Sequence, residues 1–249
     1  MVRGLDLFIK HFKDYENNFV LIGGTACAIL MEEAGADFRA TKDLDIVLIA
    51  EALNSEFVEK MWAFIEKGRY QNKMKGSEKN IFYRFANPED DTFPKMLELF
   101  SRKPDQLFYS GEGYLTPLPM EEDISSLSAI LLDEDYYRFL KQGKILINDI
   151  PVLGTEYLIP FKAKAWIDLT ERKKQGEPVD SKVIKKHKND VFRLALIVED
   201  KPVSIPKTIA DDMQSFLDEM KSDSPDLKTL GIRKITIETI LKKLDELYS

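Results

Sequence analysis

Apolar residues near the start of the chain recur at helical spacing. Leu5, Phe8, Ile9 and Phe12 lie three or four residues apart, which predicts an amphipathic helix. The same spacing predicts a later helix at 55–67, and a short helix is expected at 26–33, with Thr25 as its cap. The first part of the chain therefore contributes helices that can cover a sheet.

Short apolar runs bounded by turn residues predict the strands of that sheet. They lie at 19–22, 44–49, 80–85, 95–100 and 126–132, with a hairpin at 145–153 that turns at Asn148 and Asp149. After Thr155 the pattern becomes helical, at 155–176, 181–200, 209–220 and 237–244. We expect a mixed α/β (α+β) domain at 1–155 and a helical domain at 156–249.

Composition limits the class of protein. The chain has 249 residues, of which 44% are hydrophobic and 32% charged, as in soluble globular proteins. Its longest apolar stretch, 19–31, is interrupted by two glycines and is too short to cross a bilayer. With one cysteine, Cys27, and no signal-peptide pattern, we expect a cytoplasmic protein with no membrane partner.

Charge is distributed unevenly along the chain. The net charge of −7 argues against extensive contact with nucleic acid, yet residues 162–193 hold ten Lys or Arg against five Asp or Glu. This basic zone either attracts an anionic substrate or is a solvated helix face.

Two carboxylates occupy one expected strand. Because side chains alternate along a strand, Asp43 and Asp45 share a face, where they repel each other unless a cation neutralises them. Oxygen ligands favour Mg²⁺ or Mn²⁺. The alternative is a strand that begins at Leu44 and leaves Asp43 exposed. Glu98, an acid in another apolar strand, is the candidate third ligand, or else an edge glutamate that faces water.

A glycine pair precedes these acids. Gly23 and Gly24 let the backbone approach a ligand, and a helix that begins at Thr25 offers free amides and a dipole that favour phosphate. A phosphate cradle beside a metal site suits nucleotidyl or phosphoryl transfer.

The stretch "LIGGTACAIL…RATKDLDIVL" resembles the signature of the nucleotidyltransferase superfamily, and is most similar to its AbiEii-type branch of abortive-infection and toxin–antitoxin proteins. "LIPFKAKAWIDLTERK" and "KHKNDVFRL" are similar to later helices of that branch, so the resemblance covers about 19–195. It implies a nucleotidyltransferase-like sheet, a nucleoside triphosphate (NTP) substrate, and an acceptor hydroxyl on RNA or protein. It also implies a toxin or phage-defence role with an antitoxin partner.

The resemblance also implies roles for individual residues. Gly23, Gly24 and Thr25 would cradle the triphosphate, and two Mg²⁺ (or Mn²⁺) ions would be held by Asp43, Asp45 and Glu98. In the helical part, Lys164 would neutralise phosphate charge and Asp190 would support it or the acceptor.

Alternatives remain for several of these assignments. Lys162 could face the site in place of Lys164, and Asp168 is placed to be a simple helical partner of Lys164. We expect His187 at the surface and Cys27 in the core. The alternative functions are a non-catalytic nucleotide-binding or regulatory module on the same fold and a nucleotidyltransferase that acts on an antibiotic.

Overall fold

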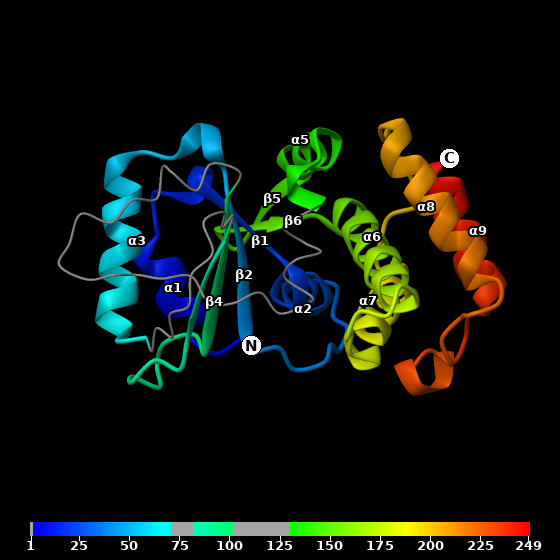
Figure 1. Ribbon diagram of the computed structural model, residues 1–249, viewed down its shortest axis with the longest axis horizontal. Coiled ribbons are helices and arrows are strands. Elements are labelled where there is room, and N and C mark those ends of the chain that lie inside the picture. Colours follow the sequence, from blue (N-terminus) through cyan, green and yellow to red (C-terminus); the bar gives the residue numbers. More distant parts are fainter. Residues whose placement is uncertain (1, 71–81, 102–129) are drawn as a thin grey trace. The chain divides into compact units, whose positions relative to one another are not determined.

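The computed structural model describes residues 2–70, 82–101 and 130–249 (Figure 1). The chain divides into two compact units. One, the sheet unit, comprises Met1–Met120 and Lys144–Leu153, and the other, the helical unit, comprises Glu121–Gly143 and Gly154–Ser249. The helical unit thus includes a segment, Glu121–Gly143, that precedes residue 155. The division into independent domains at 1–155 and 156–249 stays a prediction.

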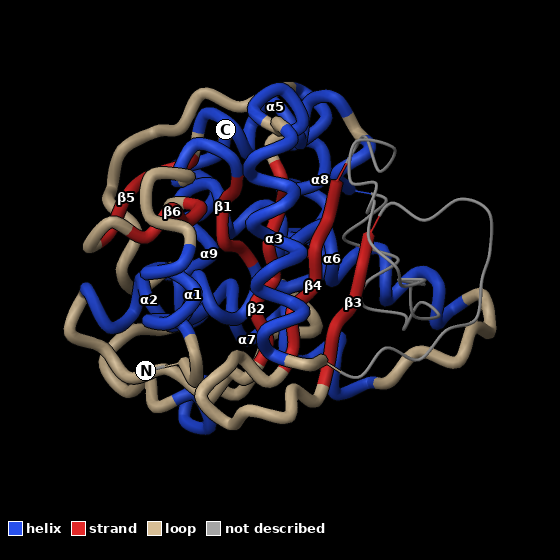
Figure 2. The backbone as a smooth tube through the Cα atoms, turned by 90° about the vertical axis from the view of Figure 1, so that its left-hand side faces the viewer, coloured by secondary structure: helices blue, strands red, loops and turns tan. Residues whose placement is uncertain are grey.

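A six-stranded mixed sheet forms the centre of the sheet unit, in the order β3-β4-β2-β1-β6-β5 (Figure 2). The strands are β1 (Phe19–Ile22), β2 (Asp43–Leu48), β3 (Phe82–Ala86), β4 (Met96–Ser101), β5 (Lys144–Ile147) and β6 (Ile150–Leu153). β2 pairs with β4, and β1 with β6, in parallel, whereas the other neighbours are antiparallel. The expected mixed α/β fold class is confirmed.

Helices cover both faces of this sheet (Figure 1). α1 (Leu5–His11) and α3 (Ser55–Gly68) lie on one face, and α2 (Gly23–Glu33) lies on the other; short 3₁₀ turns occupy Glu16–Asn18 and Ala50–Ala52. Phe8 of α1 packs edge-on against Phe19 of β1 and Phe64 of α3, with ring centroids 5.5 and 5.4 Å apart. This aromatic core fixes α1 and α3 on the face opposite Asp43 and Asp45.

The helical unit is built from α5 (Glu134–Gln142), α6 (Thr155–Lys174), α7 (Ser181–Leu194), α8 (Lys207–Met220) and α9 (Ile237–Tyr248), with a 3₁₀ turn at Leu227–Leu230. Three helices are capped by side chains: Asp133 caps α5, Asp180 caps α7 and Thr236 caps α9. Trp166 of α6 packs at 88° against Phe216 of α8, with centroids 5.4 Å apart. The four helices expected after Thr155 are confirmed.

Some expectations about single elements were wrong. The predicted strand at 126–132 lies partly outside the described residues, and Ile130–Leu132 are helical. β2 begins at Asp43, so the alternative start at Leu44 is excluded. His187 is buried, not at the surface, whereas Cys27 lies in the core as expected. Among the described residues, no helix has the length and apolar content needed to cross a membrane.

The β5–β6 hairpin turns where the sequence predicts. Asn148 and Asp149 have φ values of 49° and 63°, as in a type I′ turn, and both are exposed. Asp149→Gly should raise the free energy of unfolding by about 0.5 kcal/mol, because glycine adopts positive φ without steric cost. Urea unfolding measures the change. Asp149→Ala is the matched control and should lower stability, and an equal effect of both substitutions would contradict this account.

Candidate functional site

The turn after β1 brings the backbone against β2. Gly23 has φ +64°, and a Cβ atom added there would lie 1.7 Å from Oδ2 of Asp45. No L side chain fits in that space, so the glycine is required by both its conformation and its neighbour. The glycine turn therefore places the start of α2 directly against the Asp45 carboxylate.

Asp45 interacts with the first turn of α2. The Gly24 amide donates a hydrogen bond to Asp45 Oδ2 at 3.2 Å. A helix N-terminus favours an anion, and here the anion is a side chain of the same unit. The Gly24 amide, in the turn that the resemblance assigned to the triphosphate, thus donates its hydrogen bond to Asp45.

Thr25 has a different contact from the one expected. Its hydroxyl donates to the backbone carbonyl of Asp43 at 2.6 Å, and the side chain is fully buried. α2 begins at Gly23, before Thr25, and no side chain caps it. Thr25 therefore joins the start of α2 to the start of β2, and the expectation that it caps the helix was wrong.

Glu98 lies directly beside Asp45. The parallel β2–β4 register pairs the two residues, and their carboxyl groups are within hydrogen-bonding reach. Glu98 is 7% exposed, which excludes the edge glutamate that faces water. Burial first, and the Asp45 carboxyl second, raise the pKa of Glu98 to about 9, although Arg84 acts in the opposite direction. Glu98 thus carries a proton at neutral pH when no cation is bound.

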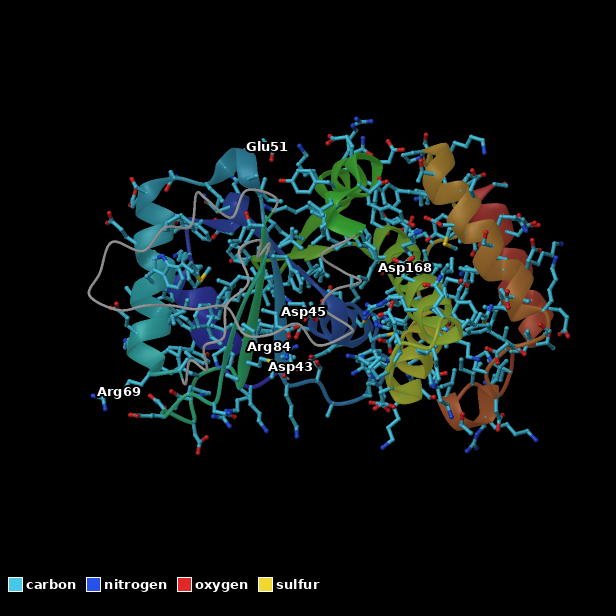
Figure 3. All side chains as sticks on the ribbon, in the orientation of Figure 1. Asp43, Asp45, Glu51, Arg69, Arg84 and Asp168 are labelled. Atoms are coloured by element: carbon cyan, nitrogen blue, oxygen red, sulfur yellow. The ribbon has the colours of Figure 1, made fainter. Side chains whose placement is uncertain are left out.

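Arg84 completes the row, and sequence reasoning missed it. It pairs with Glu98 across β3 and β4, and its Nε and Nη2 lie 2.7 and 2.6 Å from Glu98 Oε1. Figure 3 shows Asp43, Asp45 and Arg84 in this region of the sheet. The available signal was an arginine inside the apolar run "NIFYRF", the same anomaly that singled out Glu98.

Two further residues of the loop before β2 lie at the glycine turn. A Cβ atom on Gly24 would be 2.8 Å from Thr41 Oγ1 and 3.5 Å from Arg39 Nη2. Both belong to the quoted stretch "RATKDLD", but neither was assigned a role from the sequence. Arg39 brings a positive charge to the predicted phosphate cradle from within the sheet unit.

The acidic residues only partly fit a metal ion. Within the described part of the chain, no group of three or more His, Cys, Asp or Glu side chains is placed to hold one. Asp43 and Asp45 still share one face of β2. Mg²⁺ is commonly bound by one or two carboxylates together with substrate phosphates. The site therefore fits a cation that arrives with a triphosphate better than a preformed metal centre.

The two lysines of α6 have separate acidic partners within the helical unit. Lys162 is buried, and its Nζ lies 3.3 Å from Oδ2 of the fully buried Asp190. Lys164 instead contacts Asp212 at 3.0 Å and Asp168 at 3.5 Å. Burial lowers the pKa of Lys164, but the hydrogen bond to Asp212 and the charge of Asp168 outweigh it and raise the pKa. Asp190 therefore pairs with Lys162, and the role that the resemblance implied for it, in support of Lys164 or the acceptor, stays a prediction.

A groove of about 530 Å³ lies between α6, α7 and residues 223–226. Lys173, Lys185 and Lys188 line it. Trp166 and Thr170 also line it, and their buried Nε1 and Oγ1 atoms have no hydrogen-bond partner in the described structure. The groove thus combines positive charge with unsatisfied polar groups.

Comparison with known proteins gives a limited result. No protein-family model and no curated protein matches the chain. Among solved structures, an antigenic nucleotidyltransferase-like protein from Paracoccidioides brasiliensis is similar, with 14% identity, a TM-score of 0.45 and 94% of each chain covered. The solution structure of the antibiotic-resistance factor ANT(2'')-Ia is also similar, with 14% identity, a TM-score of 0.37, and 88% of this chain and 90% of that one covered. At such values the similarities show neither a family nor an activity.

The raised pKa of Glu98 predicts how stability depends on pH. Between about pH 4.5 and about pH 9, the folded protein retains a proton on Glu98 that the unfolded chain releases, so metal-free stability should fall as pH rises. Glu98→Gln should remove this part of the slope, because glutamine does not titrate. Urea unfolding across the pH range measures both proteins. Equal slopes would show that Glu98 is ionised throughout.

The ion pairs of α6 predict different effects for its two lysines. Lys162→Ala leaves a fully buried Asp190 with Arg193 at 3.6 Å, and should lower the free energy of unfolding by about 3 kcal/mol. Lys164→Ala should cost about 1 kcal/mol, because its partners are less buried. Urea unfolding separates the two, and Lys201→Ala, an exposed site, is the control. Equal losses would contradict the assignment of Lys162 to a structural pair.

Proposed function

We propose that the chain is a metal-dependent nucleotidyltransferase that moves a nucleoside monophosphate from an NTP to an acceptor hydroxyl. The observation that carries the proposal is the position of Asp45. Its carboxylate contacts the Gly23–Gly24 turn at the start of α2 and shares a face of β2 with Asp43. The proposed phosphate cradle and the proposed pair of cation ligands are thus joined by the hydrogen bond between Gly24 and Asp45.

The acids, the glycine turn, Thr25 and Arg39 each have a task in the proposed reaction. The amides at the start of α2 and the Arg39 guanidinium receive the triphosphate, and Thr25 holds α2 and β2 together at that point. Asp43 and Asp45, with Glu98 as the proposed third acid, would hold Mg²⁺ or Mn²⁺. The bound cation supplies charge neutralisation on the phosphates. Triphosphate binding requires the Gly24 amide, so Asp45 must exchange that hydrogen bond for the cation.

The bond changes are those of an in-line displacement. The acceptor oxygen forms a bond to the α-phosphorus, the bond between that phosphorus and the bridging oxygen breaks, and pyrophosphate leaves. The hydroxyl proton passes to an adjacent carboxylate of the site. Positioning and charge stabilisation supply most of the rate, as in phosphoryl transfer generally.

An anionic acceptor fits the helical unit. The groove is lined by Lys173, Lys185 and Lys188 together with Asp223 and Asp226, and Lys188 pairs with Asp223, so a small positive excess remains on a chain that is otherwise acidic. This favours an RNA end over a protein hydroxyl as acceptor. Lys164 is proposed to assist the triphosphate, and Asp190, which pairs with Lys162, is proposed to help the acceptor. From the AbiEii-type resemblance we further propose that the protein is a cytoplasmic toxin or phage-defence component with an antitoxin partner.

A specific observation favours a second candidate, a nucleotide-binding module without catalysis. Arg84 forms an ion pair with Glu98, and Asp45 accepts the hydrogen bond of the Gly24 amide. These polar groups therefore have partners in the protein without any ligand. Such a module would bind NTP and cation but transfer nothing.

Label transfer tests the two candidates. The protein is incubated with each α-labelled NTP, Mg²⁺ or Mn²⁺, and separately with cell RNA, cell protein and an aminoglycoside panel. Label on RNA supports the proposal. Label on protein or antibiotic retains the reaction but replaces the acceptor. Metal-dependent NTP binding without any transfer identifies the non-catalytic module.

Asp45→Asn should separate activity from stability. The asparagine carbonyl still accepts from Gly24, and the substitution removes a charge from beside the buried Glu98, so the metal-free protein should be at least as stable. Label transfer should fall at least about a hundredfold, because the cation loses a ligand. The control is Asp37→Asn, the same change at an exposed position of the sheet unit. An unfolded Asp45→Asn protein would show instead that Asp45 has a structural role.

A further inference from the structure

Arg84 is a buried cation that contacts the acidic residues of the sheet unit, and the proposed reaction gives it no task. Its side chain and that of Glu98 are 8% and 9% exposed, and its Nε and Nη2 atoms both contact one carboxylate oxygen, Oε1. A buried charge is retained only where a partner compensates it. Glu98 is therefore the partner that holds the Arg84 guanidinium in the protein without a bound cation.

The strand register makes this contact part of a row. β3 pairs Arg84 with Glu98, and β4 pairs Glu98 with Asp45. Directly paired residues share a face of the sheet, so the guanidinium, the two carboxyl groups and Asp43 all lie on the face that α2 covers. A cation held by Asp43 and Asp45 would lie next to the carboxyl that Arg84 already contacts.

We propose that Arg84 withholds Glu98 from the cation site, so that the protein without NTP offers a divalent cation only Asp43 and Asp45. Arg84 is then a positioning residue that keeps cation affinity low until the substrate phosphates contribute ligands. This inference rests on the proposed function for its cation, and it accounts for the absence of a three-acid metal group among the described residues. It goes beyond the three-acid set implied by the resemblance.

Manganese binding without nucleotide tests the proposal. Free Mn²⁺ is measured by electron paramagnetic resonance during titration of the wild-type protein, Arg84→Met, Glu98→Gln and the double variant. Arg84→Met should tighten Mn²⁺ binding by about tenfold or more, because a positive charge leaves and Glu98 becomes available. Glu98→Gln alone should leave the Mn²⁺ affinity without nucleotide unchanged, and the double variant should bind Mn²⁺ more weakly than Arg84→Met, because it has no carboxyl group to offer.

These measurements separate the proposal from a merely structural role. A structural arginine would leave Mn²⁺ binding unchanged or weaken it when replaced, and either result in a folded Arg84→Met protein overturns the proposal. Arg69→Met is the matched control, because Arg69 forms an exposed ion pair with Glu89 at 3.2 Å in the same unit and is labelled at the end of α3 in Figure 3.

If Arg84→Met does not fold, Mn²⁺ binding by Glu98→Gln tests the proposal instead. Weaker Mn²⁺ binding by about tenfold would show that Glu98 is a ligand despite Arg84, which overturns the proposal. Unchanged binding supports it. Label transfer by the wild-type protein reports separately on the proposed function. If the wild-type protein transfers label but Arg84→Met has the wild-type Mn²⁺ affinity, this inference alone is overturned. If the wild-type protein neither binds NTP nor transfers label, the proposed function is overturned.

Discussion

The position of one carboxylate, Asp45, is the constraint on which the site depends. Gly23 must be a glycine because Asp45 Oδ2 occupies the space of its side chain, and Gly24 donates to the same oxygen. On the other side, the β2–β4 register places Glu98 against Asp45. The turn, the helix start and the parallel strand pair are therefore arranged around a single acid, and a shift of one residue in register would move it to the aromatic core.

Charge compensation explains why the row is assembled from these residue types. Two adjacent carboxyl groups in a largely buried place would be costly if both were ionised without partners. The protein answers with a proton on Glu98, a guanidinium from Arg84 and an amide from Gly24. A bound dication could replace the proton and relieve the repulsion. The charges of the site are thus compensated without a bound cation, yet its carboxyl groups still favour the binding of a positive ion.

The features of this site that could be predicted from the sequence are those that depend on residues close together in the chain. The glycine pair, the Asp-x-Asp strand, the aligned position of Glu98 and the hairpin turn at Asn148 and Asp149 follow from alternation and turn chemistry. Arg84 did not follow, because a cross-strand partner depends on register across a loop. The pairing of Asp190 with Lys162 did not follow for a similar reason, since packing decides which sides of α6 and α7 face each other.

The helical unit shows why net charge along a sequence overstates the charge available to a partner. Lys162 is neutralised by Asp190, Lys164 by Asp212 and Asp168, and Lys188 by Asp223 at 2.8 Å. Within the described chain, Lys185 has no ion-pair partner within 4.0 Å, and it lines the groove. Attraction of an anionic acceptor must therefore come from a few groove lysines, not from the whole basic zone. Because such exposed charges are screened by salt, binding of the proposed acceptor should weaken with ionic strength while the buried pairs of α6 remain intact.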